Sequence, residues 1–240
     1  MHTIDTNYTI MMALQDYMPV LLSSIGLFLL ARMTTRMDRE AGRLAYFGWL
    51  LISLGGFNKA TWKLIMAGTA SQTNLVWLDD SLFMLMGPGF VCMAWALWCG
   101  QRTLAGRKRP IGPIWAFPLV VGGLHVAVAV FLGTTRPDTR TWFFVMLGLT
   151  TIGNFVVGGL AIRQARQRGM HFVGFLFAFN LVAILVLTGL ARIDPRTDVL
   201  EWTAQITNTI SNGAFAYAAW KLCQEIEARV PAVRVAAQTA

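Results

Sequence analysis

Long runs of apolar residues, separated by short polar loops, make up most of the chain. Seven of these runs are long enough to cross the roughly 30 Å hydrocarbon layer of a membrane as helices of about 20 residues. We expect them near residues 16–35, 44–67, 77–100, 112–134, 141–163, 171–193 and 198–223. The pattern therefore predicts an all-α integral membrane protein with seven transmembrane helices.

The composition agrees with this class of protein. Of 240 residues, 55% are hydrophobic and 13% are charged, whereas a soluble domain carries about 25% charged residues. The formal net charge is +8, but the arginines and lysines lie between apolar runs, so they predict a lipid bilayer rather than a nucleic acid as partner. The three cysteines show no CxxC or Cys/His spacing, so no metal ion, disulfide or other cofactor is expected.

The loop charges predict an orientation. Positive residues concentrate after the first, third and fifth runs, in residues 32–39, 102–109 and 163–168, whereas residues 69–76, 135–140 and 192–198 hold fewer net positive charges. Because positive loops stay in the cytoplasm, we expect the N-terminus outside and the C-terminus inside, in a bacterial inner membrane. Residues 1–15 are then an extracytoplasmic lead-in, 16–223 the membrane domain and 224–240 a disordered cytoplasmic tail.

The first three runs resemble the last three. Residues 22–28 (LSSIGLF) match residues 149–155 (LTTIGNF), and Arg36 and Arg39 then fall on Arg163 and Arg166. In the third and seventh runs the matching pairs are Trp77 and Trp202, Phe90 and Phe215, Ala94 and Ala219, Trp95 and Trp220, and Leu97 and Leu222. The second and sixth runs agree less well, because matching Asn58 with Asn180 and Gly48 with Gly174 requires spacings that differ by four residues.

These matches leave two interpretations, chance similarity between apolar helices or an internal repeat. A repeat predicts a 3+1+3 plan, in which residues 16–100 and 141–223 are two three-helix units of the same orientation and 112–134 is a linker helix. The plan resembles that of PQ-loop and SWEET-type carriers, and of trimeric intracellular cation channels. The resemblance is one of topology only, because the chain has no Pro-Gln dipeptide.

The second run carries polar and aromatic residues of a kind that commonly forms sites, namely Asn58, Lys59, Trp62 and Lys63. A charge at the centre of a bilayer costs about 2.5–3.5 kcal/mol on insertion scales. Lys63 lies near the outer end, where its side chain can extend to the headgroups, whereas Lys59 is one turn deeper and needs a partner, a ligand or a wet cavity. Asp79 is expected to cap the third helix, and Asp80 either to cap it or to pair with Lys63.

Polar residues in four other runs complete the expected ligand site. The last run holds a stripe with helical spacing, Glu201, Gln205, Asn208 and Asn212, which must face protein or water rather than lipid. Its alternative role is hydrogen bonding between helices. The fourth, fifth and sixth runs contribute His125, Asn154 and Asn180, each of which alone is more typical of packing than of ligand binding.

Gly87-Pro88-Gly89 falls near the middle of the third run. Proline removes a backbone hydrogen bond and crowds the preceding turn, so the segment predicts either a static kink or a hinge for motion. Non-helical backbone inside a membrane is tolerated where it lines a cavity.

Three functions follow from these patterns, in decreasing order of support. The first is a carrier or channel for a small polar or anionic solute, with its cavity in the outer half of the bundle. The second is a seven-helix sensor, receptor or accessory subunit that binds a ligand or partner without transport, and the third is a lipid-modifying enzyme. No GxSxG, HExxH, P-loop or GxGxxG motif is present, and the only lysine of the last run, Lys221, lies at its cytoplasmic end, where it cannot hold retinal. The sequence leaves a homo-oligomer open.

Overall fold

The structure is a computed structural model that describes residues 9–108, 110–136, 139–190, 193 and 197–229. These residues form helices and loops, with no strand among them. The helices are α1 (Ile10–Gln15), α2 (Tyr17–Met37), α3 (Arg39–Gly68), α4 (Val76–Leu104), α5 (Ala116–Thr135), α6 (Thr141–Arg166), α7 (His171–Leu190) and α8 (Asp198–Arg229). An all-helical chain was expected, and each of the seven predicted runs contains one long helix.

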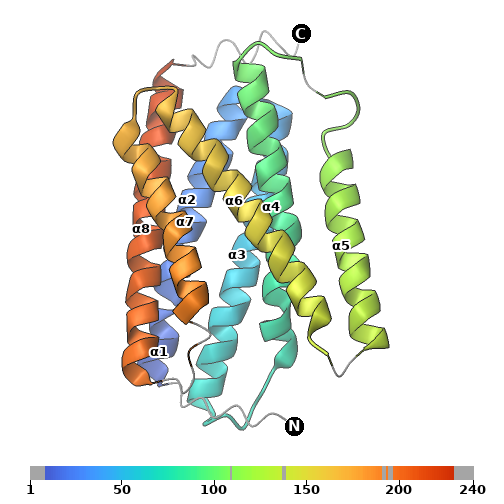
Figure 1. The fold of residues 1–240 in the computed structure, drawn as a ribbon, viewed down its shortest axis with the longest axis vertical. Coiled ribbons are helices and arrows are strands. Elements are labelled where there is room, and N and C mark those ends of the chain that lie inside the picture. Colours follow the sequence, from blue (N-terminus) through green and yellow to red (C-terminus); the bar gives the residue numbers. More distant parts are fainter. Residues whose placement is uncertain (1–8, 109, 137–138, 191–192, 194–196, 230–240) are drawn as a thin grey trace.

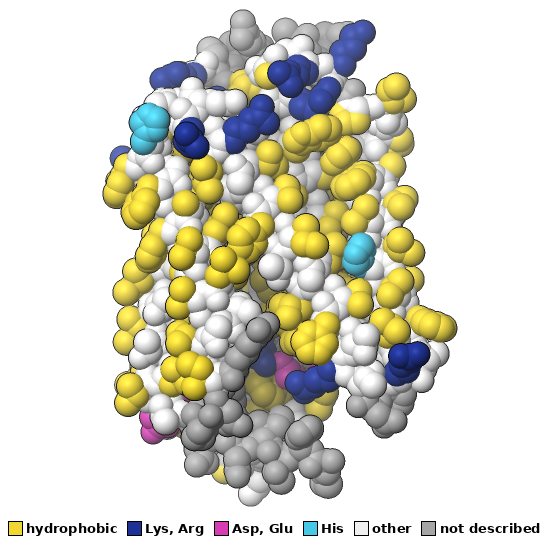
Figure 2. All heavy atoms as spheres, in the orientation of Figure 1, with side chains coloured by type: hydrophobic (Ala, Val, Ile, Leu, Met, Phe, Trp, Pro, Cys, Tyr) yellow, Lys and Arg dark blue, Asp and Glu magenta, His cyan; other side chains and the backbone are white. Residues whose placement is uncertain are grey.

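The helices form one elongated bundle (Figure 1). α3 packs on α2 and α4, α8 packs on α2 and α7, and α6 packs on α4 and α7. α5 lies at the edge of the bundle, where it contacts α4 and α6. We call the end where α2 stops and α3 begins the basic end, because arginines and lysines gather there at the top of Figure 2.

The main core occupies the half of the bundle near the basic end. Six of its large apolar side chains have no exposed surface: Leu30, Met33, Leu44, Leu97, Leu222 and Ile226. They come from the final turns of α2, α4 and α8 and the first turns of α3. Burying such a side chain stabilises a fold by about 1.5–3 kcal/mol in water, and in lipid close packing takes over this role. Apolar contacts therefore hold the interior of this half of the bundle together.

Five helical segments in the described chain are long and apolar enough to cross a membrane: Ile10–Met37, Val76–Leu104, Ala116–Thr135, Thr141–Arg166 and His171–Leu190. They present large apolar side chains outward, such as Leu119 and Phe131 on α5, which are 74% and 64% exposed. Figure 2 shows hydrophobic side chains over the flank of the bundle. The fold is thus compatible with an all-helical integral membrane protein.

The other two predicted spans, α3 and α8, are long helices but less apolar. α3 carries Lys59 and Lys63, and α8 carries the polar stripe that begins at Glu201. Both helices extend beyond the predicted runs, because α3 begins at Arg39 and α8 continues to Arg229. Residues 224–229 of the expected disordered tail are therefore helical, and the rest of that tail lies outside the described residues.

The two halves of the chain pack on each other through matching contacts. α2 of the first half lies on α8 of the second, and α6 of the second half lies on α4 of the first. A Cβ atom at Gly26 would lie 2.5 Å from the ring of Phe215, and a Cβ atom at Gly153 would lie 2.7 Å from the Cβ of Phe90. Gly26 matches Gly153 and Phe90 matches Phe215 in the sequence comparison, so the two contacts are reciprocal.

The match between α3 and α7 is weaker. α3 has 30 residues and α7 has 20, and both begin at the basic end. Asn58 lies about five turns from the start of α3, whereas Asn180 lies about two and a half turns from the start of α7. The expected correspondence of these two asparagines is therefore wrong in depth, and the last turns of α3 have no counterpart in the described part of α7.

The Gly87-Pro88-Gly89 segment does not interrupt α4, which is helical from Val76 to Leu104. Each of the three residues faces a different helix. A Cβ at Gly87 would touch Met146 and Leu149 of α6, Pro88 lies against Gly122 of α5, and a Cβ at Gly89 would touch Ile52 of α3. The small residues thus allow three helices to approach α4 at one level, and a role as a hinge remains a prediction.

Candidate functional site

Lys59 lies inside the bundle, about 13 Å along α3 from the last residue of that helix. Its ammonium group forms an ion pair with Asp79 of α4 and lies 4.1 Å from the ring centroid of Trp62. The side chains of Lys59 and Asp79 are each 28% exposed. Asp79 does not cap α4 as expected, because α4 begins at Val76 with Leu75 in the capping position. Instead, the Asp79 carboxylate is the charged partner that we expected Lys59 to need at its position inside the bundle.

Lys63 pairs with a residue that sequence reasoning did not place in the site. Its Nζ is 2.5 Å from the carboxylate of Asp16, at the junction of α1 and α2. The expected pair between Lys63 and Asp80 is therefore wrong. Since Lys63 follows Lys59 by one turn, the two lysines share a face of α3 but lean to opposite sides, one toward α2 and one toward α4.

Further hydrogen bonds connect the last three turns of α3 to α4 and to the loop between the two helices. Asn58 Nδ2 donates to Ser81 Oγ of α4 at 2.9 Å, and Trp62 Nε1 donates to Asn74 Oδ1 at 2.9 Å. Asp80 is partly buried and forms no ion pair with a described residue.

The polar stripe of α8 includes one residue with unsatisfied hydrogen-bonding groups. Gln205 is 5% exposed, and neither atom of its side-chain amide has a hydrogen-bond partner in the described part of the chain. A buried polar group without a partner costs about 1–3 kcal/mol. Asn212 Nδ2, by contrast, donates to Oδ1 of Asn208 at 2.8 Å, one turn earlier. Glu201 begins the stripe in the first turn of α8.

The three isolated polar residues fall in different places. His125 Nδ1 lies 2.7 Å from the carbonyl oxygen of Val121 on its own helix, and α4 and α6 separate α5 from α7 and α8. Asn180 is buried and donates to the carbonyl oxygen of Ser211 at 3.1 Å, so it joins α7 to α8. Asn154 is half-buried on α6. The structure therefore does not bring His125 to Lys59.

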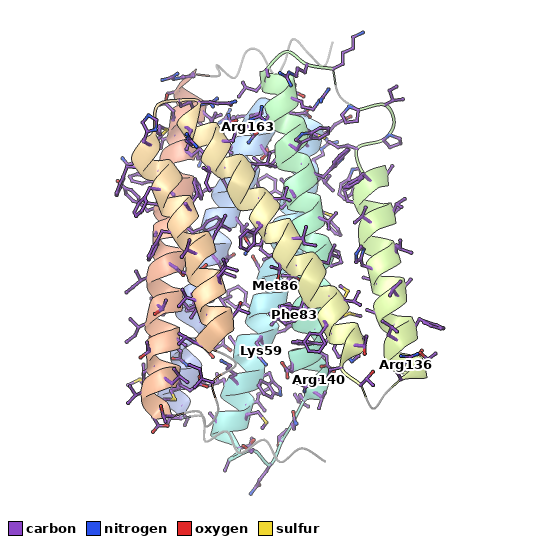
Figure 3. The ribbon with its side chains drawn as sticks, viewed as in Figure 1. Lys59, Phe83, Met86, Arg136, Arg140 and Arg163 are labelled. Carbon is purple, nitrogen blue, oxygen red and sulfur yellow. The ribbon has the colours of Figure 1, made fainter. Side chains whose placement is uncertain are left out.

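The face of the bundle drawn in Figure 2 has a hollow in the half away from the basic end. Figure 2 shows its surface hollowed between α7 and the lower part of α6, and charged side chains are visible within the hollow. Figure 3 places Lys59 behind the same region, with Phe83 and Met86 of α4 beside it and Arg140 at the start of α6. We call this region the polar hollow, with α3 at its back, α4 and α6 on one side and α7 and α8 on the other.

The chemistry of the polar hollow is that of hydrogen bonding and paired charge. No group of three or more His, Cys, Asp or Glu side chains that could hold a metal ion occurs in the described chain. A second polar region lies at the basic end, where Trp98, Gln101, Arg102, Ala105, Arg107, Arg163 and Gln167 line a cavity of about 140 Å³. Sequence reasoning treated these arginines only as topology signals.

The described residues thus form an all-helical bundle whose apolar helices are compatible with a membrane protein. Comparison of the chain with protein-family models, with curated proteins and with solved structures gives no match.

Proposed function

We propose that the chain crosses the membrane seven times, with α3 and α8 as spans and the basic end in the cytoplasm. In this arrangement α2–α4 and α6–α8 are two parallel three-helix units, and α5 is the linker that inverts the chain between them. The reciprocal contacts of Gly26 with Phe215 and of Gly153 with Phe90 support a repeat. Parallel repeats of this kind place their substrate site between the two units.

From this arrangement we infer a carrier or channel for a small polar solute, which binds in the polar hollow. The observation that supports it best is the unsatisfied amide of Gln205 on α8, because a solute with hydrogen-bonding groups that reaches this side chain would satisfy them. Lys59 and Lys63 are each paired with a carboxylate, so among the described residues these two lysines offer no unpaired charge to an anion. An uncharged or zwitterionic solute therefore fits better than an anionic one.

Replacing Gln205 with leucine tests this function. Because the change removes a buried amide without a partner, it should leave the free energy of unfolding unchanged or raise it by about 1 kcal/mol. The variant should therefore unfold at the temperature of the parent protein or above it. Solute binding should weaken about tenfold or more. The measurement is thermal unfolding in detergent with a panel of sugars, amino acids and other small polar solutes, followed by flux of each hit into proteoliposomes.

Ile206→Leu, on the exposed neighbouring position of α8, is the matched control and should leave both readouts unchanged. Undiminished binding and flux in Gln205→Leu would contradict the proposed site.

A sensor or accessory subunit is the second candidate. It is favoured by the apolar core near the basic end, where large side chains such as Leu30, Leu97 and Leu222 have no exposed surface. The same experiment separates the two functions, since a sensor binds a solute without flux and a carrier does both.

The proposed orientation can be measured with single cysteines, because the three native cysteines are buried. Gln72→Cys lies in the exposed loop between α3 and α4, and Lys108→Cys lies in the exposed loop after α4. In intact cells a membrane-impermeant maleimide should label Gln72→Cys and should label Lys108→Cys only after permeabilisation. The reverse pattern would overturn the orientation, and equal labelling of both would overturn the assignment of α4 as a span.

A further inference from the structure

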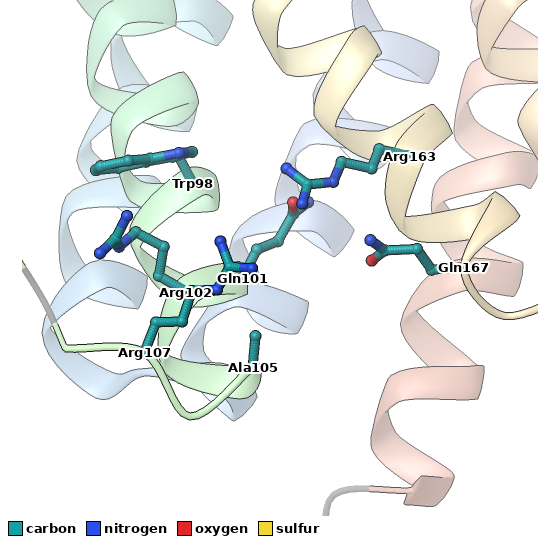
Figure 4. Close-up of a pocket in the computed structure, with 7 residues that line it drawn as sticks. All are labelled: Trp98, Gln101, Arg102, Ala105, Arg107, Arg163 and Gln167. Carbon is teal, nitrogen blue, oxygen red and sulfur yellow. The ribbon is translucent and has the colours of Figure 1, made fainter.

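The cavity at the basic end lies between the last turns of α4 and α6 (Figure 4). Its lining contains three arginines, Arg102, Arg107 and Arg163, and no acidic residue. We call it the arginine pocket. At about 140 Å³ it is smaller than the pockets of about 300–1,000 Å³ that hold drug-sized ligands, so a compact group suits it.

The reciprocal packing gives this pocket a counterpart on the other side of the bundle. The alignment that places Phe90 on Phe215 places Arg102 on Glu227, and the alignment that places Gly26 on Gly153 places Arg36 on Arg163. The junction of α2 with α8 can therefore be compared, position by position, with the junction of α6 with α4.

In the junction of α2 with α8 the arginines have a carboxylate between them. Arg32 donates to the two carboxylate oxygens of Glu227 from Nε at 2.7 Å and from Nη2 at 3.0 Å. Arg36 Nε lies 3.5 Å from the same carboxylate. In the junction of α6 with α4 the residue that corresponds to Glu227 is Arg102, so the described lining contains Arg102 and Arg163 but no carboxylate.

The guanidinium groups of the arginine pocket are only partly engaged. Arg102 donates from Nε and Nη2 to the carbonyl oxygen of Lys108 and lies 4.9 Å from the ring centroid of Trp98. The side chains of Arg107 and Arg163 make no hydrogen bond or ion pair with any described residue. Several guanidinium donors are therefore free to bind an anion, which would occupy the place that the Glu227 carboxylate takes in the other junction.

We propose that the arginine pocket binds a phosphate group. Guanidinium groups bind phosphate through paired, charge-assisted hydrogen bonds, and basic pockets between helices on the cytoplasmic side bind lipid headgroups. The phosphate belongs either to an anionic phospholipid or to a soluble phosphate compound. This site is separate from the polar hollow, which lies in the other half of the bundle, and the proposal does not depend on transport.

Aromatic side chains connect the arginine pocket with the apolar flank of the bundle. The ring centroids of Trp98 and Trp95 are 4.9 Å apart, and Trp95 stacks on Phe117 of α5 at 4.3 Å. Phe117 is 45% exposed. A phospholipid with its phosphate in the pocket therefore has an apolar surface beside it for its acyl chains.

The test is thermal unfolding of the purified protein in a neutral detergent with three additions at matched ionic strength. These are phosphatidylglycerol, phosphatidylcholine and inorganic phosphate. Phosphatidylglycerol or inorganic phosphate should raise the unfolding temperature. Arg163→Gln should weaken the binding of whichever of the two has this effect by about tenfold or more. Arg166→Gln, an exposed arginine one turn away that does not line the pocket, should leave the response unchanged.

Arg102→Glu is the second variant, because it places a carboxylate where Glu227 stands in the other junction. It should match or exceed the parent in unfolding temperature without any ligand, and it should lose the response to phosphate. A response to phosphatidylglycerol alone identifies a lipid site, and a response to inorganic phosphate identifies a soluble ligand. Equal loss of response in Arg163→Gln and Arg166→Gln, or no response in the parent protein, would overturn the proposal.

Discussion

A Gly48→Leu variant is expected to lose at least about 3 kcal/mol of stability, because α3 and α4 touch backbone to backbone at this position. A Cβ at Gly48 would lie 2.6 Å from the carbonyl oxygen of Gly89 and 3.0 Å from the backbone nitrogen of Met93. Backbone atoms cannot rotate away as side-chain atoms can. The helices would have to separate and to reopen the apolar contacts beside them, so thermal unfolding in detergent should occur at a much lower temperature.

Gly123→Leu is the matched control for this prediction. Gly123 is exposed on α5, and a Cβ there would meet no described atom within 4 Å. Because leucine favours the helix by about 1 kcal/mol over glycine, the control should unfold at the parent temperature or slightly above it. Similar unfolding temperatures for the two variants would show that α3 and α4 do not pack at Gly48 and Gly89.

Lys59→Met is expected to destabilise the bundle by about 2 kcal/mol, because it leaves Asp79 without its partner. Breaking a fully buried pair costs about 3–5 kcal/mol, and the 28% exposure of both side chains reduces that value through screening. Asp79→Leu should have a similar cost. The double variant Lys59→Met with Asp79→Leu should recover most of the loss, since replacing both charges by apolar groups is often neutral or stabilising.

The measurement is a double-mutant cycle of unfolding free energies in mixed detergent micelles. If the losses of unfolding free energy in the two single variants simply add in the double variant, the coupling energy is near zero. That result would contradict an ion pair between Lys59 and Asp79. The double variant also separates stability from function, because it should fold while lacking the charges at the back of the polar hollow. Loss of solute binding in that variant would assign the pair a role in the site as well as in the fold.

The helical class and the positions of the long helices could be predicted from the sequence because they rest on local patterns. Apolar runs of sufficient length identify membrane-like helices wherever they pack, so each predicted run contains a helix. The partners of the lysines could not be predicted in the same way. Asp79 and Asp80 are adjacent in sequence but point in different directions on α4, and only the packing of α3 against α4 selects Asp79.

The ion-pair partner of Lys63, Asp16, was even harder to predict from the sequence. It is the first residue of the expected first span, where the sequence pattern indicated no partner for it, yet the junction of α1 and α2 brings its carboxylate to Lys63. The arginine pocket was missed for another reason. Its arginines were explained fully by topology, and only the structural pairing of α2 with α8 and of α4 with α6 shows that Arg102 stands where Glu227 would balance the charge.

In the proposed membrane topology, the Lys59–Asp79 pair also bears on how the chain would enter the bilayer during synthesis. α3 is not among the segments apolar enough to cross a membrane alone, whereas α4, the next helix along the chain, is. The ion pair joins these consecutive helices through residues 20 positions apart. If the two helices leave the insertion machinery together as a hairpin, each charge meets its partner before either reaches lipid. α3 would then depend on α4 for its insertion, so a chain that ends before α4 should fail to integrate α3.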